Sequence, residues 1–441
     1  VTGVQTCALP ISIAPGFAVG FPALMPLILT GVTGALVFAL ARRVAGAPMA
    51  ALTFLLWVST FGNLRFRATY FSELTTSCAW LVAWWALLSW RERRTWPWMV
   101  VLAAATGWGA ITRPATMFLF AIPVGIVVLR DAWRGKNRTQ WRQVVLGVAC
   151  GSAVLAVLPF WSARVTGHWR TTPLAEYTRQ YLPFDIPGYT VDITPPERSL
   201  PPEMERVRTF LRDIKTEQAT APVGATFAGR SGLLLRDAFA GWRIPFALAF
   251  AVGLVVAGSA GWFAIGTSLL LVVGYVTQAH TADWSIYYLE AYPAIAFVAA
   301  LGVRAIGQVA ARRSRLASQP SRTGRPLSSW AAAAIMVAAC AGLAFDTINA
   351  RDTLGRIASH TAEFRAGVDA LPRKPNIVFV RYAEGRNMHL SLVANAGDLA
   401  RAPSWIVHDR GAGNVRLMDL APGRTAYLFD ESRNSFYEMT R

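Results

Sequence analysis

Long apolar segments separated by short polar connections dominate the first three quarters of the chain. A helix needs roughly 17–25 mostly apolar residues to cross the hydrocarbon core of a bilayer. Segments with this pattern lie near residues 18–41, 46–62, 74–90, 97–112, 114–130, 143–161, 240–258, 261–278, 287–307 and 329–346. The pattern therefore predicts an all-α polytopic membrane bundle with about ten spans.

Basic residues fall in every second connection between these segments. They are Arg42 and Arg43; Arg91, Arg93 and Arg94; Arg130, Arg134, Lys136, Arg138 and Arg142; and Arg312, Arg313, Arg315, Arg322 and Arg325. Connections rich in Lys and Arg stay in the cytoplasm, so these are expected to be cytoplasmic and the others to face outward. The first span would then run from outside to inside, and we expect at least one earlier span in a complete protein.

Three polar stretches complete the expected organisation. Residues 162–239 predict a large extracytoplasmic loop with a short amphipathic helix, and residues 308–328 a basic cytoplasmic loop within the membrane domain, 12–346. Residues 347–441 lose the membrane composition. TLGRIASHTAEFRAGVDAL predicts a helix there, and NIVFVRY, SWIVHDR and TAYLFDE predict strands between Gly/Pro turns. We therefore expect a small C-terminal extracytoplasmic α/β domain.

The first eleven residues, VTGVQTCALPI, fit none of these patterns. They resemble the in-frame translation of a common short-read sequencing adapter, so residues 1–11 are excluded from the fold prediction as an artefact. An adapter fused in frame implies that the natural N-terminus is missing and that the chain is a fragment.

Composition supports a membrane protein and argues against nucleic-acid binding. Of 441 residues, 54% are hydrophobic and only 15% are charged, whereas soluble domains have about 25% charged residues. The net charge of +18 is spread over short runs between apolar segments and does not form one basic soluble face. The four cysteines show no CxxC or Cys/His spacing, so neither a disulfide framework nor a zinc site is indicated.

Ionisable residues gather at the predicted outward ends of the helices. They are Arg67 and Glu73 in RFRATYFSELTT, Arg113 in TGWGAITRPATM, and His280, Asp283, Tyr287 and Glu290 in AHTADWSIYYLEAYP. Since charge inside a bilayer is costly, we expect these groups to line one outward cavity. Arg suits phosphate recognition, and a carboxylate beside it, such as Glu73, can hold a divalent cation. A substrate with an apolar tail and an anionic head fits such a cavity.

Several of these residues also have a purely structural interpretation. Arg113 can cap the preceding helix and extend its charge to the interface, and Glu73 can complement a helix dipole or pair with a nearby arginine. His280 and Asp283 can be exposed loop residues, and Tyr287 can belong to the interfacial aromatic belt.

Three of these motifs carry a family resemblance. TGWGAITRP resembles the glycine-spaced helix ending in Thr-Arg/Lys of GT-C polyprenyl-phosphate-dependent glycosyltransferases, of the protein-mannosyltransferase and aminoarabinose-transferase type. YFSEL resembles their acidic outer-loop motif. YYLEAYPAIAFVAALGV resembles a later helix of the family, with Ile286 or Tyr287 in place of its arginine.

The resemblance implies inverting transfer of a sugar from a polyprenyl-phosphate donor to a protein, lipid or glycan acceptor, outside a bacterial inner membrane. It implies that Arg113 contacts the phosphate and that Glu73 holds Mg²⁺ or Mn²⁺ or orients the phosphate. The family's catalytic base lies in a first outer loop that this chain lacks, so the fragment is expected to be inactive. The alternatives are a transporter or lipid flippase, and a non-catalytic membrane scaffold.

Overall fold

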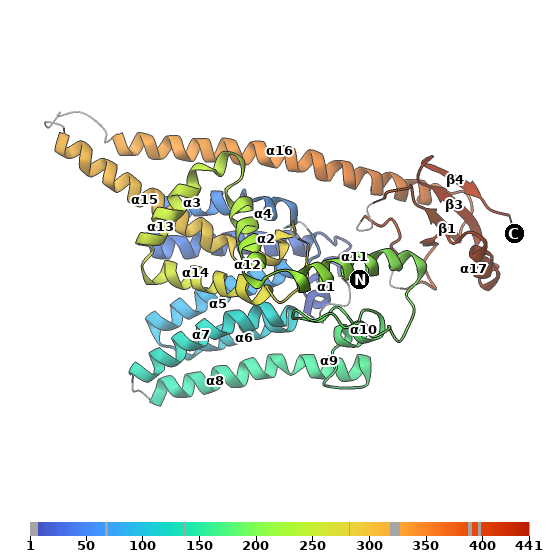
Figure 1. Cartoon of the computed structure of the whole chain (residues 1–441), viewed down its shortest axis with the longest axis horizontal. Coiled ribbons are helices and arrows are strands. Elements are labelled where there is room, and N and C mark those ends of the chain that lie inside the picture. The colour runs from blue at the N-terminus through green and yellow to red at the C-terminus, as the bar shows by residue number, and fades with distance from the viewer. Residues whose placement is uncertain are drawn as a thin grey trace. The chain divides into compact units, whose positions relative to one another are not determined.

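The computed structural model describes residues 8–66, 69–135, 138–281, 283–317, 327–386, 390–395 and 398–440. The chain forms two compact units: residues 1–199 with 210–348, and residues 200–209 with 349–441. The helices of the first unit are drawn in Figure 1. They are α1 (Ala8–Ala18), α2 (Leu24–Ala45), α3 (Ala47–Val58), α4 (Phe61–Phe66), α5 (Ser72–Arg93), α6 (Trp96–Thr112), α7 (Pro114–Gly135), α8 (Arg138–Leu155), α9 (Val157–Thr166), α10 (Pro173–Tyr181), α12 (Val223–Phe239), α13 (Pro245–Val256), α14 (Gly258–Tyr275) and α15 (Tyr292–Ala317). Helices α11 (Pro202–Thr220) and α16 (Leu327–Asp369) each contribute to both units.

The membrane bundle is confirmed, but the expected ten spans are not. Six helices in the described ranges are long and apolar enough to cross a membrane, or seven if one bent pair counts as a single span. Two predicted spans, 46–62 and 240–258, form helices α3 and α13 of only 12 residues each. Helix α13 follows α12 after a 99° bend at Gly241, whose positive φ of 60° interrupts the helix.

The polar stretches contain more helix than the sequence pattern predicts. Residues 162–239 hold the end of α9 and the helices α10, α11 and α12, not one short amphipathic helix. Helix α15 continues through Ala317 into the predicted basic loop, because the segment is rich in Ala and Arg, both good helix formers. Helix α1 begins at Ala8 and so includes the last residues of the adapter-like stretch.

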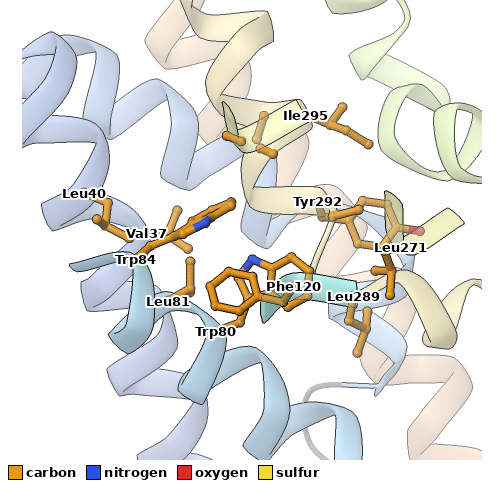
Figure 2. Close-up of a cluster of buried hydrophobic side chains, with 14 of the residues drawn as sticks. Val37, Leu40, Trp80, Leu81, Trp84, Phe120, Leu271, Leu289, Tyr292 and Ile295 are labelled. Atoms are coloured by element: carbon orange, nitrogen blue, oxygen red, sulfur yellow. The ribbon is translucent and has the colours of Figure 1, made fainter. Parts of the chain in front are cut away.

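The core of the first unit is apolar and rich in aromatic side chains. Trp80 and Trp84 of α5 pack against Phe120 of α7, with ring centroids 4.3 Å and 6.4 Å from Phe120. Figure 2 shows these rings next to Val37 and Leu40 of α2. Helices α2, α5 and α7 are therefore joined by one continuous buried cluster.

Helices α13 and α15 pack backbone to backbone. A Cβ atom built on Gly302 would lie 1.7 Å from the carbonyl oxygen of Ala249, and one on Gly253 would lie 2.0 Å from that of Val298. Only glycine fits at either position, as is common where membrane helices approach closely.

Basic residues collect at one end of the bundle, where α2, α5 and α7 end. Arg43 pairs with Glu92 at 2.5 Å, while Arg91 and Arg94 both pair with Asp131 at 2.9 Å and 3.1 Å. These basic residues lie at the opposite helix ends from Glu73 and Arg113, because α5 begins beside Glu73 and α7 begins after Arg113.

The second unit contains a four-stranded sheet with the order β2-β1-β3-β4. Its strands are β1 (Asn376–Arg381), β2 (Ser404–His408), β3 (Thr425–Asp430) and β4 (Ser435–Glu438). Strand β1 runs parallel to both neighbours, and β4 is antiparallel to β3. Phe364 and Val368 of α16 cover one face, and Met418 of α17 (Asn414–Leu420) covers the other. Burial on both faces explains the unbroken apolar run of β1.

Candidate functional site

A backbone constraint places Arg113 at the candidate site. Helix α6 ends at Thr112 because the residue before a proline is driven out of the helical region, and Arg113 has φ −140° and ψ 86°. Its amide still donates to the Gly109 carbonyl at 2.7 Å. Pro114 then starts α7, so the guanidinium leaves a tight turn between two helices.

Arg113 lies between two buried carboxylates, Glu73 at the start of α5 and Glu290 in the turn before α15. Its Nη1 is 3.3 Å from Oε1 of Glu290, and its Nη2 is 3.6 Å from Oε1 of Glu73. Glu73 lies in the first turn of α5, where the helix dipole favours negative charge, and its other oxygen accepts from Ser72 at 3.2 Å. Arg113, Glu73 and Glu290 are 7%, 6% and 1% exposed. Three residues that are distant in the sequence therefore form one buried ionic cluster.

Aromatic side chains complete the surroundings of the guanidinium. Arg113 Nη2 donates to the Tyr275 hydroxyl at 2.5 Å, and that hydroxyl also bonds Thr116 at 2.7 Å. The rings of Tyr275 and Tyr287 lie 5.4 Å and 5.8 Å from the guanidinium carbon, within cation–π distance. Tyr287 thus belongs to the cluster and is not only an interfacial aromatic residue.

His280 lies behind Tyr287, in the connection after α14. Its ring is 4.7 Å from the Tyr287 ring, and its Nε2 is 2.8 Å from the Tyr288 hydroxyl. Burial, together with the nearby positive charge of Arg230, lowers the pKa of His280 to about 4. Burial also raises the pKa of Tyr288 to about 12. Both groups are therefore neutral at physiological pH and act as hydrogen-bonding groups.

The remaining predicted residues lie elsewhere. Asp283 is exposed on the loop after His280, outside the buried cluster. Arg67 lies outside the residues that the structure describes.

The sequence analysis missed Tyr275, Thr116 and Arg230. Arg230 of α12 donates to the backbone carbonyls of Tyr275, the last residue of α14, and of Gln278 in the turn that follows. Tyr275 and Thr116 lie in apolar segments, and Arg230 lies in a stretch expected to be a loop, so no local pattern marked them.

A buried lysine fixes the loop beside the cluster. Lys215 of α11 is fully buried, and its Nζ donates to the carbonyls of Ile186 and Gly188 at 2.7 Å and 2.6 Å. Burial lowers the pKa of Lys215, and burial raises the pKa of Asp185 in the same loop. The loop is also joined to α14, since Gly188 N donates to the Thr277 carbonyl at 2.7 Å.

Comparison with solved structures identifies the fold. The chain resembles the crystal structure of ArnT from Cupriavidus metallidurans bound to undecaprenyl phosphate, with a TM-score of 0.55 and 14% identity over 96% of this chain and 83% of that chain. It also resembles the apo state of that protein, with a TM-score of 0.53 and 15% identity over 96% and 82% of the two chains. The chain therefore has the overall fold of these two structures, and six of its helices in the described ranges are long and apolar enough to cross a membrane.

The sequence comparison is more specific for the N-terminal part. Residues 11–161 match the family model described as dolichyl-phosphate-mannose-protein mannosyltransferase. A comparison with curated proteins finds no match for the chain. The matched segment includes Glu73 and Arg113, so the resemblance noted in the sequence is confirmed where two of its three motifs lie.

Proposed function

We propose that the protein is a membrane glycosyltransferase that takes a sugar from a polyprenyl-phosphate donor. The buried cluster of Arg113, Glu73 and Glu290 is the observation that carries this proposal. Arg is the side chain best suited to phosphate, because its planar guanidinium donates two hydrogen bonds and stays charged. The similarity to ArnT, whose crystal structure holds undecaprenyl phosphate, supports a lipid phosphate as the ligand.

The contacts of Arg113 suggest how the phosphate would enter. Tyr275 and Glu290 hold the guanidinium at 2.5 Å and 3.3 Å, whereas the contact with Glu73 is longer, at 3.6 Å. The phosphate would replace Glu73 as the partner of Nη2, while Glu290 and Tyr275 keep the guanidinium in position. In this proposal Arg113 touches the substrate, and Glu290 and Tyr275 are positioning residues.

The proposed reaction is an inverting displacement. An acceptor hydroxyl oxygen bonds to the anomeric carbon from the face opposite the phosphate, and the bond from that carbon to the phosphate oxygen breaks. The hydroxyl proton passes to a base, and polyprenyl phosphate leaves with the bonding electrons. Arg113 stabilises the charge that develops on the leaving phosphate, which is usually the largest contribution to catalysis. No residue of the described cluster is assigned as the base.

A divalent metal at Glu73 fits this geometry poorly. The Arg113 guanidinium already lies between Glu73 and Glu290, where a cation shared by the two carboxylates would sit. Among the described residues, no group of three or more His, Cys, Asp and Glu side chains is placed to hold a metal ion. The proposed reaction therefore includes no step through Mg²⁺ or Mn²⁺.

We also propose an orientation in a bacterial inner membrane. The basic helix ends, including Arg43, Arg91 and Arg94, would face the cytoplasm according to the positive-inside rule. The cluster of Arg113, at the other helix ends, would then face outward. If α15 and α16 are two successive crossings, the C-terminal unit would be extracytoplasmic as well.

The test is binding of undecaprenyl phosphate to the purified chain. Arg113→Gln removes a charge-assisted bond and is expected to weaken binding about tenfold or more. Arg164→Gln is the matched control, because Arg164 is an exposed arginine of α9 outside the cluster, and its binding should equal wild type. Glu73→Gln should strengthen binding, since Glu73 competes with the phosphate for Arg113.

Two results would contradict parts of this proposal. Wild-type binding in Arg113→Gln would refute the phosphate site. If Mg²⁺ or Mn²⁺ strengthens binding and Glu73→Gln abolishes that effect, Glu73 holds a metal and the competition argument is wrong.

Transfer is then measured as release of undecaprenyl phosphate from a panel of undecaprenyl-phosphate sugars in vesicles.

A further inference from the structure

A cavity within the bundle is lined by none of the residues of the Arg113 cluster. It has a volume of 420 Å³, within the usual range of about 300–1,000 Å³ for ligand pockets, and lies between α2, α3, α5, α7, α14 and α15. Apolar side chains such as Val37, Leu40, Leu81 and Trp84 form its walls, and Figure 2 shows these four on the neighbouring helices α2 and α5.

The cavity opens at the basic end of the bundle. Leu81, Thr53 and Ala294 line its inner part and are each only 1% exposed. At the other end it is lined by Arg91 and Arg130, whose side chains are 41% and 47% exposed. Along α5, Arg91 lies ten residues after Leu81, which is a rise of about 15 Å at 1.5 Å per residue. This is half of the roughly 30 Å hydrocarbon core, so the cavity has the depth of one leaflet.

Positive charge is in excess at the opening. Among the described residues, Arg91, Arg94 and Arg130 share the one carboxylate of Asp131, so positive charge exceeds negative by two in this group. Arg91 uses its Nε for Asp131, at 2.9 Å, and Arg130 contacts Asp131 at 3.4 Å. An anionic group at the opening would balance this excess.

We propose that this cavity binds one anionic membrane phospholipid of the leaflet at the basic end of the bundle. The phosphate lies against Arg91 and Arg130, and an acyl chain fills the apolar space between α2, α5 and α14. Basic pockets between membrane helices are known sites for anionic head groups. A polyprenyl chain is longer than one leaflet, which makes the sugar donor a poorer fit. This site is independent of the proposed transfer reaction.

The experiment measures binding of dioleoylphosphatidylglycerol to the purified, delipidated protein by native mass spectrometry, with dioleoylphosphatidylcholine as the neutral lipid. The expected preference for phosphatidylglycerol is about tenfold or more, from the two excess charges. Arg130→Gln should reduce phosphatidylglycerol affinity about fivefold. Arg134→Gln is the control, because Arg134 is exposed on the same helix and does not line the cavity; it should bind like wild type.

A second pair of variants tests the cavity itself. Ala260→Phe fills the space beside α14 and should abolish binding at a ratio of one lipid to one chain, whereas Ala251→Phe, on the exposed face of α13, should not. Equal affinity for the two lipids, or equal loss in Arg130→Gln and Arg134→Gln, would overturn the proposal. It would also be overturned if undecaprenyl phosphate or inorganic phosphate displaced phosphatidylglycerol in wild type.

Discussion

At the scale of single residues, the chemistry of the site was predictable but its geometry was not. Arg113, Glu73 and Glu290 could be predicted as site residues because a charged residue at the end of an apolar helix is costly in a membrane and therefore indicates a function. Their convergence depends on the packing of α5, α7, α14 and α15, which no local pattern encodes. Tyr275 was missed for the same reason: in the sequence it is one aromatic residue at the end of an apolar run.

His280 gives the site a dependence on pH. Its pKa is lowered from 6.5 to about 4, mainly by burial. Between these values the unfolded chain binds a proton that the folded chain does not, so the stability contribution is full above pH 6.5 and is lost as the pH falls toward 4. Because His280 is only partly buried, we expect the free energy of unfolding to fall by about 2 kcal/mol as the pH falls through this window.

The measurement is thermal unfolding of the detergent-solubilised protein at pH 7 and pH 5. The melting temperature should fall more in wild type than in His280→Gln, which has no group that titrates there. Equal falls in the two proteins would show that His280 does not carry this dependence.

At the scale of elements, the sequence predicted whether a segment is a helix or a strand better than it predicted where each element begins and ends. The strands β1, β2 and β3 coincide with NIVFVRY, SWIVHDR and TAYLFDE. Strand β4 was not predicted, because SFYE is short and half exposed and pairs with β3 only at the edge of the sheet. The predicted span at 329–346 and the predicted helix after it form one continuous helix, α16, since no proline or glycine cap separates them.

The seam between α13 and α15 allows a direct test of packing. Gly302→Ala places a methyl group 1.7 Å from the Ala249 carbonyl, so the helices must separate, and we expect a loss of about 1–3 kcal/mol. Gly307→Ala, on the same helix with no atom within 4 Å of the new Cβ, should be neutral or slightly stabilising. The measurement is the melting temperature of each variant, which should fall in Gly302→Ala and not in Gly307→Ala. An unchanged melting temperature in Gly302→Ala would disprove the close contact.

At the scale of the whole molecule, the number of crossings and the two-unit organisation depend on long-range structure. Hydropathy counts α3 and α13 as spans because both are apolar, although each has only 12 residues. The alternation of basic connections is a more robust signal, because it depends on charge and not on helix length.

The proposed orientation predicts which surfaces an impermeant maleimide reaches in spheroplasts. In a chain without its natural cysteines, Trp169→Cys after α9 and Ser432→Cys in the C-terminal unit should react without permeabilisation. Arg134→Cys, at the end of α7, should react only after it. Equal reaction of Trp169→Cys and Arg134→Cys in intact spheroplasts would contradict the orientation.

Helix α5 is fastened by ion pairs at both of its ends. Glu73 joins it to Arg113 at one end, and Glu92 and Arg91 join it to α2 and α7 at the other. With both ends paired in this way, helix α5 cannot slide or tilt independently of its neighbours when the surrounding bilayer becomes thinner or thicker. The bilayer must then deform around the bundle to match it, so the spacing between the two charged ends acts as a fixed gauge of hydrophobic thickness.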